Sequence, residues 1–231
     1  MRILAGTSGY SYKEWKGPFY PEKLPAKQML AFYAKHLPAV EINNTFYRMP
    51  KPSVLENWAE QVPADFRFVL KASRRITHFK RLKGTEEETD YLLETAASLG
   101  EKLGALLFQL PPNMKKDVDR LRAFLSHLPK EPAKAFEFRH ASWFDEEVYS
   151  ALGRSNAALC LADTEDGEPP LVATADWGYL RLRRNGYNKK TLTSWVYRLQ
   201  QLDWNRAFVF FKHEDAGTGP LLATEFLNTA L

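Results

Sequence analysis

The amino-acid sequence predicts a single α/β domain folded as a parallel (β/α)8 TIM barrel, and three observations carry this prediction. Short apolar runs rich in β-forming residues recur eight times, with stretches of helical character between most of them. The runs are nearly continuous rather than alternating, which is typical of strands covered on both faces. The length of 231 residues suits one barrel, and no linker divides residues 1–231 into two domains.

The predicted strands follow one another at regular intervals along the chain. They cover Ile3–Ser8, Ala39–Asn43, Phe66–Ala72, Leu103–Leu110, Ala135–Arg139, Ala157–Asp163, Gly178–Arg183 and Ala207–His213. Alternating strands and helices fit either a closed barrel or an open doubly wound sheet. The count of strands favours the barrel, and the glycine-rich motifs of the common open-sheet nucleotide sites do not occur in the sequence.

Helix signals lie between the strands. One apolar helix face is predicted by residues spaced four, three and four apart, namely Leu92, Ala96, Leu99 and Leu103. Thr85 and Glu88 resemble a capping box at the start of that helix, and Pro220 suits the first turn of the last helix. The sixth connection, residues 164–177, is short and holds two prolines, so we expect no full helix there.

Composition and charge narrow the class of protein. The formal net charge of +4 is mildly basic, which permits a phosphorylated ligand or nucleic acid without requiring either. The single cysteine, Cys160, cannot form an internal disulfide and is expected in the core. The apolar run Met1–Gly6 is too short for a signal peptide, and no stretch has the length of a membrane span. We therefore expect a cytoplasmic protein with no membrane partner, and the oligomeric state is not indicated.

Polar residues late in the predicted strands locate the expected functional site. A charge that faced the helix layer would be buried away from water at high cost. We therefore expect these side chains to point into the mouth of the barrel, where the active sites of this fold lie. They are Ser8, Glu41, Asn43, Lys71, Gln109, Glu137, Arg139, Asp163, Arg181 and Arg183, together with Lys212 and His213, whose facing the sequence leaves open.

The candidate catalytic residues are three carboxylates and one lysine. Glu41, Glu137 and Asp163 suit general acid–base work, because carboxylates that share a cavity can have their pKa values pushed apart. Lys71 could instead act as a Schiff-base lysine if it is desolvated. The alternative is that these charges satisfy one another as a structural ion-pair network.

The remaining candidates are substrate-binding residues. Arginine binds phosphate and carboxylate groups in a bidentate manner, which suits Arg139, Arg181 and Arg183. Gly217 and Gly219 lie in a turn before the last helix, where backbone N–H groups can bind an anion unless the turn is merely flexible.

Aromatic and histidine side chains also follow strand ends. Tyr10, Tyr47 and Trp143 are candidates to stack on a substrate, with His140 nearby, and the alternative is a hydrophobic plug. His78, His140 and His213 can approach the mouth, but no His-x-His or His-Glu-x-x-His spacing occurs. No metal ligand or cofactor is therefore assigned, although a divalent metal stays an open alternative.

Several motifs together resemble the domain-of-unknown-function 72 (DUF72) family, the YecE-like proteins. They are GTSGYSY at 6–12, WKG at 15–17, FYP at 19–21, EINNTFY at 41–47, FVLKA at 68–72, ITH at 76–78, QLPP at 109–112, EFRH at 137–140 and SW at 142–143. The resemblance is dense from residue 6 to about 143 and looser to the end. It implies a TIM barrel and no settled activity, and a suggested likeness of such barrels to metal-dependent endonucleases is analogy only.

The last third of the chain departs from the family pattern. Members commonly carry Arg-x-His-Gly on the seventh strand and Phe-Asn-Asn on the eighth. Here these positions read Arg-Leu-Arg-Arg at 181–184 and Phe-Lys-His at 211–213. The substitutions make the expected mouth more cationic.

Three hypotheses about function follow. The first is a hydrolase or lyase acting on a phosphorylated or otherwise anionic substrate, with nucleic acid as one such substrate. The second is a sugar isomerase or glycosidase that uses Glu41 and Glu137 as a carboxylate pair. The third is a non-catalytic barrel that binds nucleic acid or a partner protein.

Overall fold

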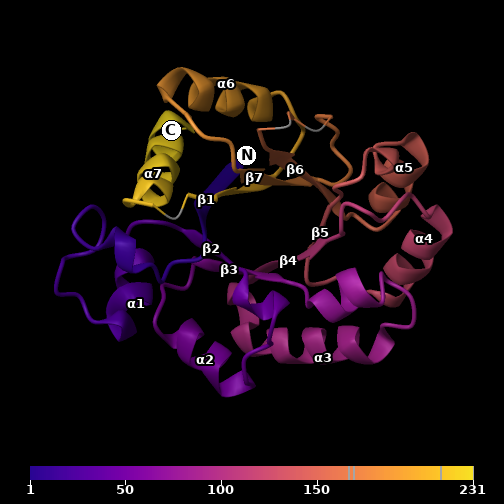
Figure 1. The fold of residues 1–231 in the computed structure, drawn as a ribbon, viewed down its shortest axis with the longest axis horizontal. Coiled ribbons are helices and arrows are strands. Elements are labelled where there is room, and N and C mark those ends of the chain that lie inside the picture. The colour runs from indigo at the N-terminus through magenta and orange to yellow at the C-terminus, as the bar shows by residue number, and fades with distance from the viewer. Residues whose placement is uncertain (166, 169, 214, 231) are drawn as a thin grey trace.

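The computed structural model describes residues 1–165, 167–168, 170–213 and 215–230. In this part of the chain, eight parallel strands close into a barrel in sequence order, and the helices surround it (Figure 1). The strands are β1 (Arg2–Ser8), β2 (Ala39–Ile42), β3 (Arg67–Lys71), β4 (Leu103–Gln109), β5 (Lys134–Glu137), β6 (Ala158–Asp163), β7 (Trp177–Leu182) and β8 (Arg206–Phe211). The predicted (β/α)8 class is confirmed, and each predicted strand is present within two residues at either end.

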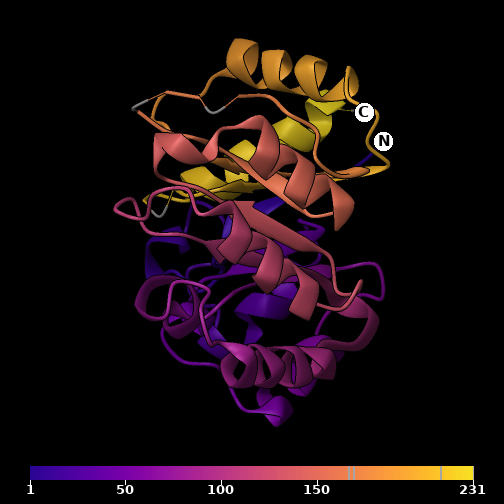
Figure 2. The same ribbon diagram turned by 90° about the vertical axis from the view of Figure 1, so that its right-hand side faces the viewer.

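The α-helices follow the strands in the outer layer (Figures 1 and 2). They are α1 (Met29–Tyr33), α2 (Pro52–Glu60), α3 (Glu86–Ala96), α4 (Val118–His127), α5 (Glu146–Arg154), α6 (Lys189–Gln200) and α7 (Thr218–Ala230). The described residues between β6 and β7 form no helix, as expected for the sixth connection. None of the helices in the described chain is long and apolar enough to cross a bilayer.

Two details of the predicted helices differ from the structure. Thr85 does occupy the N-cap position of α3, but its side chain makes no capping hydrogen bond, and Glu88 binds Lys80 at 2.8 Å instead. The helix also ends earlier than its periodicity predicts. A short 3-10 segment, Ala97–Lys102, carries Leu99, and Gly100 has a φ of 55°, so the chain turns into β4 at Leu103.

The interior of the barrel is filled unevenly. Small side chains from β2, β4, β5 and β6 meet large rings from β7 and β8, and the inward-facing set includes Ala39, Ala105, Ala135, Ala158, Trp177, Tyr179, Phe208 and Phe210. The pairing of β3 with β4 shifts register beside Gly104, where an added Cβ would lie 2.8 Å from Phe208 Cζ. The rings of β7 and β8 therefore reach across the barrel into space left by alanine and glycine.

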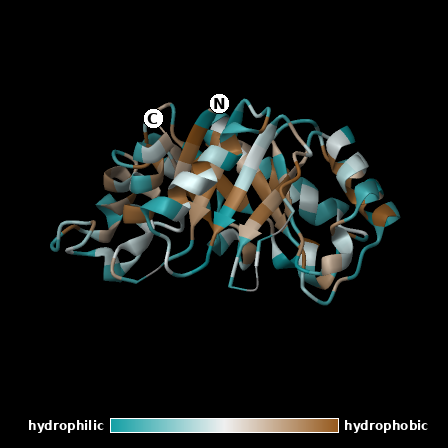
Figure 3. Cartoon of the chain, turned by 90° about the horizontal axis from the view of Figure 1, so that it is seen from above, coloured by the Kyte–Doolittle hydropathy of each residue, from teal (hydrophilic) through white to brown (hydrophobic). Residues whose placement is uncertain are grey.

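The opposite face of each strand packs against the helices. Phe68, Phe108, Phe136 and Phe211 belong to this second, larger apolar cluster, which also contains Leu55, Leu92, Leu121 and Phe226 from the helices. Figure 3 shows the strands as mostly hydrophobic segments at the centre, with mixed hydropathy on the helices around them. Both strand faces are thus apolar along most of their length, as the continuous apolar runs predicted.

Gly178 is expected to be essential for the contact between β7 and Trp204. An added Cβ would lie 2.0 Å from Trp204 Cζ3, so the buried indole would have to move. We expect Gly178→Ala to lower the free energy of unfolding by roughly 1–3 kcal/mol in urea denaturation. The control variant is Gly153→Ala, in helix α5. An added Cβ there would lie 3.5 Å from the Thr174 carbonyl oxygen, which is an ordinary contact distance. That variant should be unchanged or more stable by up to about 1 kcal/mol, and equal losses in both variants would contradict the packing argument.

Candidate functional site

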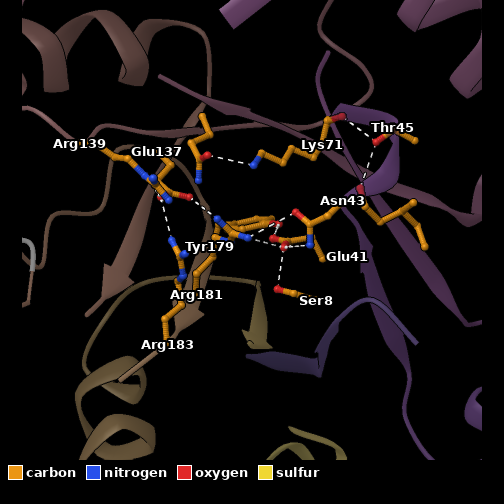
Figure 4. A network of polar contacts seen from close by, with 12 residues as sticks. Ser8, Glu41, Asn43, Thr45, Lys71, Glu137, Arg139, Tyr179, Arg181 and Arg183 are labelled. Atoms are coloured by element: carbon orange, nitrogen blue, oxygen red, sulfur yellow. Dashed lines mark hydrogen bonds and ion pairs between the residues drawn. The ribbon is translucent and has the colours of Figure 1, made fainter. Parts of the chain in front are cut away.

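A layer of polar side chains lies above the apolar interior, at the carboxyl ends of the strands. Each of its members continues the inward-facing positions of its own strand by the two-residue alternation of side chains. Strand register sets neighbouring members side by side, with Ser8 opposite Glu41 and Gln109 opposite Glu137. The predicted candidates that share this layer are Ser8, Glu41, Asn43, Lys71, Gln109, Glu137, Arg139, Arg181 and Arg183 (Figure 4).

The centre of this layer is the Arg181 guanidinium, which bridges two buried glutamates. Its Nη2 lies 2.8 Å from Glu41 Oε1, and its Nη1 lies 2.6 Å from Glu137 Oε2 (Figure 4). The exposed fractions of the three side chains are 3%, 0% and 2%. Buried charges of this kind are tolerated only when each is paired and hydrogen-bonded. The bridge therefore joins β2, β5 and β7 at the mouth of the barrel.

Glu41 is saturated with hydrogen-bond donors. Ser8 Oγ donates to Oε1 at 2.7 Å, Asn43 Nδ2 donates to the same oxygen at 3.1 Å, and the Tyr179 hydroxyl donates to Oε2 at 2.6 Å. Burial alone would raise the pKa of the Glu41 carboxyl, but Arg181 and the hydrogen bonds from Tyr179 and Ser8 outweigh it, so the pKa lies below its ordinary value. Glu41 is consequently ionised at neutral pH.

Glu137 is held among three arginines. Arg139 Nε donates to its Oε1 at 3.1 Å, and Arg183 Nη1 lies 3.6 Å from the same oxygen, in addition to the contact with Arg181. Burial works against the charged form, yet the three guanidinium groups hold the pKa of Glu137 well below its ordinary value. The pKa values of Glu41 and Glu137 are therefore both lowered rather than pushed apart, and neither carboxyl carries a proton to donate.

Lys71 lies in the same layer without a carboxylate partner in the described chain. Its Nζ donates to Gln109 Oε1 at 2.9 Å and lies 4.1 Å from the centre of the Phe46 ring. Burial and the positive charge of Arg181 lower the pKa of Lys71 to about 8, against the partial compensation of Glu137 and Glu41. A substantial share of this amine is thus neutral near physiological pH.

A cavity of about 690 Å³ opens beside the bridge, over the ends of β5, β6 and β7. Its lining includes Glu137, Arg139, Cys160, Ala162 and Arg183. Arg139 and Arg183 keep 35% and 21% of their side-chain surface exposed there, in contrast to the 3% of Arg181. The two arginines can therefore meet a ligand, whereas Arg181 is enclosed.

Asp163 lies outside this layer, on the helix-facing side of β6. Cys160 belongs to the inward-facing cluster and Leu161 to the outer one, and Asp163 shares the face of Leu161. Its Oδ2 accepts a hydrogen bond from the Tyr187 hydroxyl at 2.6 Å and lies 3.8 Å from Arg184 Nε. The expectation that a charged residue near the end of a strand points into the mouth is wrong for Asp163. Its carboxylate is satisfied on the outer side by Tyr187 and Arg184, from the loop after β7.

His213 contacts Arg184 and Tyr187, the same two residues that contact Asp163. Its Nε2 contacts the Arg184 carbonyl oxygen at 2.9 Å, and its ring lies 5.8 Å from that of Tyr187. Lys212 precedes it and is exposed. The sequence did not indicate which way His213 points. In the structure its side chain points away from the barrel interior.

Gly217 packs against the first loop, and Gly219 packs against the backbone of His213 after β8. A Cβ at Gly217 would lie 3.0 Å from Pro18 Cβ, and one at Gly219 would lie 2.7 Å from the His213 carbonyl oxygen. Thr218 N already donates to the Asp215 carbonyl oxygen at 2.9 Å. The two glycines allow close packing of α7.

The aromatic candidates divide by exposure. Trp143 is fully buried, stacked on Phe138 at 4.7 Å, with its indole N–H donated to the Met114 carbonyl oxygen. Tyr10 is half-buried and packs against the core near Trp58, at 6.5 Å between ring centres. Tyr47, by contrast, is 67% exposed. His140 Nδ1 contacts Ser142 Oγ at 2.9 Å beside the cavity wall.

Two residues of the layer escaped the sequence analysis. Tyr179 stands two positions before Arg181 on the same strand face, and this spacing was the available signal for it. Phe46 places its ring under the Lys71 amine, and Thr45 fixes that loop because its hydroxyl lies 2.7 Å from the Lys71 carbonyl oxygen. Among the residues that the structure describes, no cluster of three or more His, Cys, Asp or Glu side chains suits a metal ion.

The fold and site define a TIM barrel with a buried ionic network and an adjoining cavity, lined in part by Arg139 and Arg183, at the carboxyl ends of its strands. The chain belongs to the family described as protein of unknown function DUF72, whose model matches residues 4–230. This confirms the family indicated by the sequence motifs.

Relatives of known sequence or structure agree with this membership. The UPF0759 protein YunF of Bacillus subtilis is 30% identical over 204 residues, which is 81% of this chain and 71% of YunF. The UPF0759 protein YecE of Escherichia coli is 34% identical over 113 residues, and the match spans 48% of this chain and 42% of YecE. The crystal structure of a DUF72 family protein from Thermotoga maritima superposes with a TM-score of 0.87 at 27% identity, covering 99% of this chain and 98% of that one.

The Arg181 bridge is expected to stabilise the fold strongly, because its loss would leave Glu41 and Glu137 buried with less compensation. We expect Arg181→Met to lower the free energy of unfolding by about 3–5 kcal/mol in urea denaturation at neutral pH. Arg122→Met removes a surface ion pair with Asp119, at 3.2 Å and with side chains 46% and 95% exposed, and should cost less than about 1 kcal/mol.

The pH dependence of the stability difference between wild type and Arg181→Met tests whether the ionic bridge causes that difference. Carboxyls with lowered pKa values stabilise the fold above their ordinary pKa of 4.5, and this contribution is lost as the pH falls below that value. The stability gap between wild type and Arg181→Met should therefore narrow in acid. A gap that stays constant from neutral pH to below 4.5 would contradict the ionic explanation.

Proposed function

We propose that the protein is an enzyme of the lyase type that binds a small phosphorylated or carboxylated substrate at Arg139 and Arg183. In this proposal the Lys71 amine acts as the base or nucleophile. The observation that carries it is the Lys71 amine itself, which is buried beside Gln109 and Phe46 with a pKa lowered to about 8. Perturbed groups of this kind are characteristic of functional sites, and Lys71 belongs to the same inward-facing polar layer as Arg139 and Arg183.

The chemistry of Lys71 follows from its surroundings. A neutral amine can remove a proton from a carbon next to a carbonyl group, or attack the carbonyl carbon itself. An ordinary lysine, with a pKa of about 10.4, offers very little neutral amine at physiological pH. Because its pKa is about 8, Lys71 offers a much larger share of neutral amine at this pH.

The carboxylates support a lyase better than a hydrolase or a glycosidase. Glu41 and Glu137 both bind Arg181, with no proton to give and little basicity for activating water. The guanidinium also fills the space between them, where a carboxylate pair of a glycosidase would need its substrate. Their role in the proposal is to position Arg181 and Arg139.

The anion specificity rests on Arg139 and Arg183. Arg139 uses Nε for Glu137, and its two terminal nitrogens make no hydrogen bond to the described residues. Arg183 lies at 3.6 Å from Glu137 and lines the same cavity. Guanidinium groups with spare donors suit bidentate binding of phosphate or carboxylate.

Competitive labelling with acetic anhydride tests the Lys71 amine without knowledge of the substrate. We expect acetylation of Lys71, followed by peptide mass spectrometry, to rise with pH around a midpoint of about 8. Exposed lysines should follow the ordinary lysine pKa of about 10.4. The Lys71→Met variant identifies the labelled peptide, and a Lys71 midpoint equal to that of the exposed lysines would refute the proposed role.

Titration with inorganic phosphate tests the anion site. Arg139→Met and Arg183→Met should each weaken phosphate binding about tenfold or more in calorimetry, because each removes a charge-assisted hydrogen bond. Arg184→Met is the matched control, since Arg184 is the next residue along the chain but lies toward Asp163 on the outer face. An equal loss in Arg184→Met, or no phosphate binding by the wild-type protein, would count against the proposal.

A further inference from the structure

A second surface lies at the rim of the barrel, outside the cavity. It consists of Tyr47, from the loop after β2, and Arg74 and Phe79, from the loop after β3; we call these three residues the aromatic rim. The rings of Tyr47 and Phe79 are each 67% exposed, among the highest values for large hydrophobic side chains in the described chain. The Arg74 guanidinium carbon lies 5.5 Å from the Tyr47 ring centre and 5.3 Å from that of Phe79.

The loop that carries Arg74 and Phe79 is strongly basic. Residues 74–83 contain five lysines and arginines and no acidic residue. Arg75 and Lys80 pair with Glu88, at 3.7 and 2.8 Å. Arg74 and Lys83 make no ion pair within the described ranges. Glu87 and Glu88 line a pocket beside Tyr47, so the positive charge that remains without an ion-pair partner in the described ranges lies at Arg74 and Lys83.

The loop is also held in a defined conformation. Its residues Arg75–Phe79 form a π-helical turn, a rare element that occurs frequently at functional sites. Two residues without glycine's freedom, Arg81 and Leu82, adopt left-handed φ values of 52° and 66°. The buried Leu82 side chain and the hydrogen bond from Leu82 N to the Ile76 carbonyl oxygen, at 2.9 Å, fix this turn. The exposed Phe79 ring is thus presented in a defined position rather than on a loose loop.

From this arrangement we infer that the aromatic rim binds single-stranded nucleic acid, with bases stacked on Tyr47 and Phe79 and phosphates held by Arg74 and the basic loop. A polynucleotide alternates flat bases with negative charges, and the rim alternates flat rings with a positive charge. Base–aromatic stacking is tolerant of sequence because every base has a π face. An acidic protein segment would match the charges but would leave the two exposed rings without partners.

The aromatic rim is also continuous with the mouth of the barrel. The Tyr47 ring packs edge to face against the Phe46 ring, with 5.0 Å between the ring centres. The Lys71 amine lies over the Phe46 ring, 4.1 Å from its centre. His78 contacts Phe46 from the other loop, at 4.9 Å between ring centres. A strand bound along the rim would pass beside the cavity, yet its binding does not depend on the reaction proposed for Lys71.

Fluorescence anisotropy with labelled oligothymidylate and oligouridylate of about twelve nucleotides tests the inference at low salt. Wild-type protein should bind one or both oligonucleotides, and comparison of the two distinguishes DNA from RNA. Tyr47→Ala and Phe79→Ala should each weaken binding about tenfold, the loss expected for one stacked base. Arg74→Met should weaken binding and reduce the slope of log K against log salt by about 0.7, the loss of one phosphate contact.

The matched control for the rings is Tyr197→Ala, because Tyr197 is 64% exposed but lies on α6. That variant should bind like the wild type, and thermal melting should show that all variants remain folded. The inference is overturned if neither oligonucleotide binds, or if Tyr197→Ala loses as much affinity as Tyr47→Ala. It is also overturned if Tyr47→Ala and Phe79→Ala leave oligonucleotide binding unchanged, or if a polyglutamate peptide binds as tightly as the oligonucleotides.

Discussion

The mouth of this barrel depends on one interaction, the Arg181 guanidinium held between Glu41 and Glu137. Three charges with almost no exposed surface lie there within hydrogen-bond distance of one another, and Arg139 and Arg183 add the positive charge that the second carboxylate requires. The bridge fixes the ends of β2, β5 and β7 in one arrangement. It also keeps both carboxyls ionised, which removes them from the list of proton donors and leaves them as positioning groups.

The bridge is part of a layer in which positive charges outnumber negative ones. The inward-facing layer brings the cations Lys71, Arg139, Arg181 and Arg183 together with the carboxylates Glu41 and Glu137, so the cations outnumber the carboxylates. Burial and, after it, the charge of Arg181 lower the pKa of Lys71, and two arginines at the cavity remain partly exposed. A cationic mouth next to a basic loop with exposed rings suits negatively charged ligands at both surfaces.

Much of this architecture could be predicted from the sequence, because it follows from local patterns. Continuous apolar runs placed all the strands, and alternation along a strand placed Glu41, Glu137, Arg139 and Arg181 on inward faces. The same rule failed for Asp163, which has the same position late in an apolar strand. Its partners Tyr187 and Arg184 come from the loop after β7, and no pattern within β6 reveals them.

The sequence by itself determined the barrel, the end that carries the polar layer and most members of that layer, since the alternation of side chains along a strand is a property of a short segment. Only the tertiary structure decided which charges pair, that Arg181 is enclosed while Arg139 and Arg183 remain accessible, and that Lys71 has an amide and a ring as neighbours. These outcomes depend on distances between residues as far apart as Glu41 and Arg181. Burial and charge at such sites are set by the whole closed barrel rather than by any one strand.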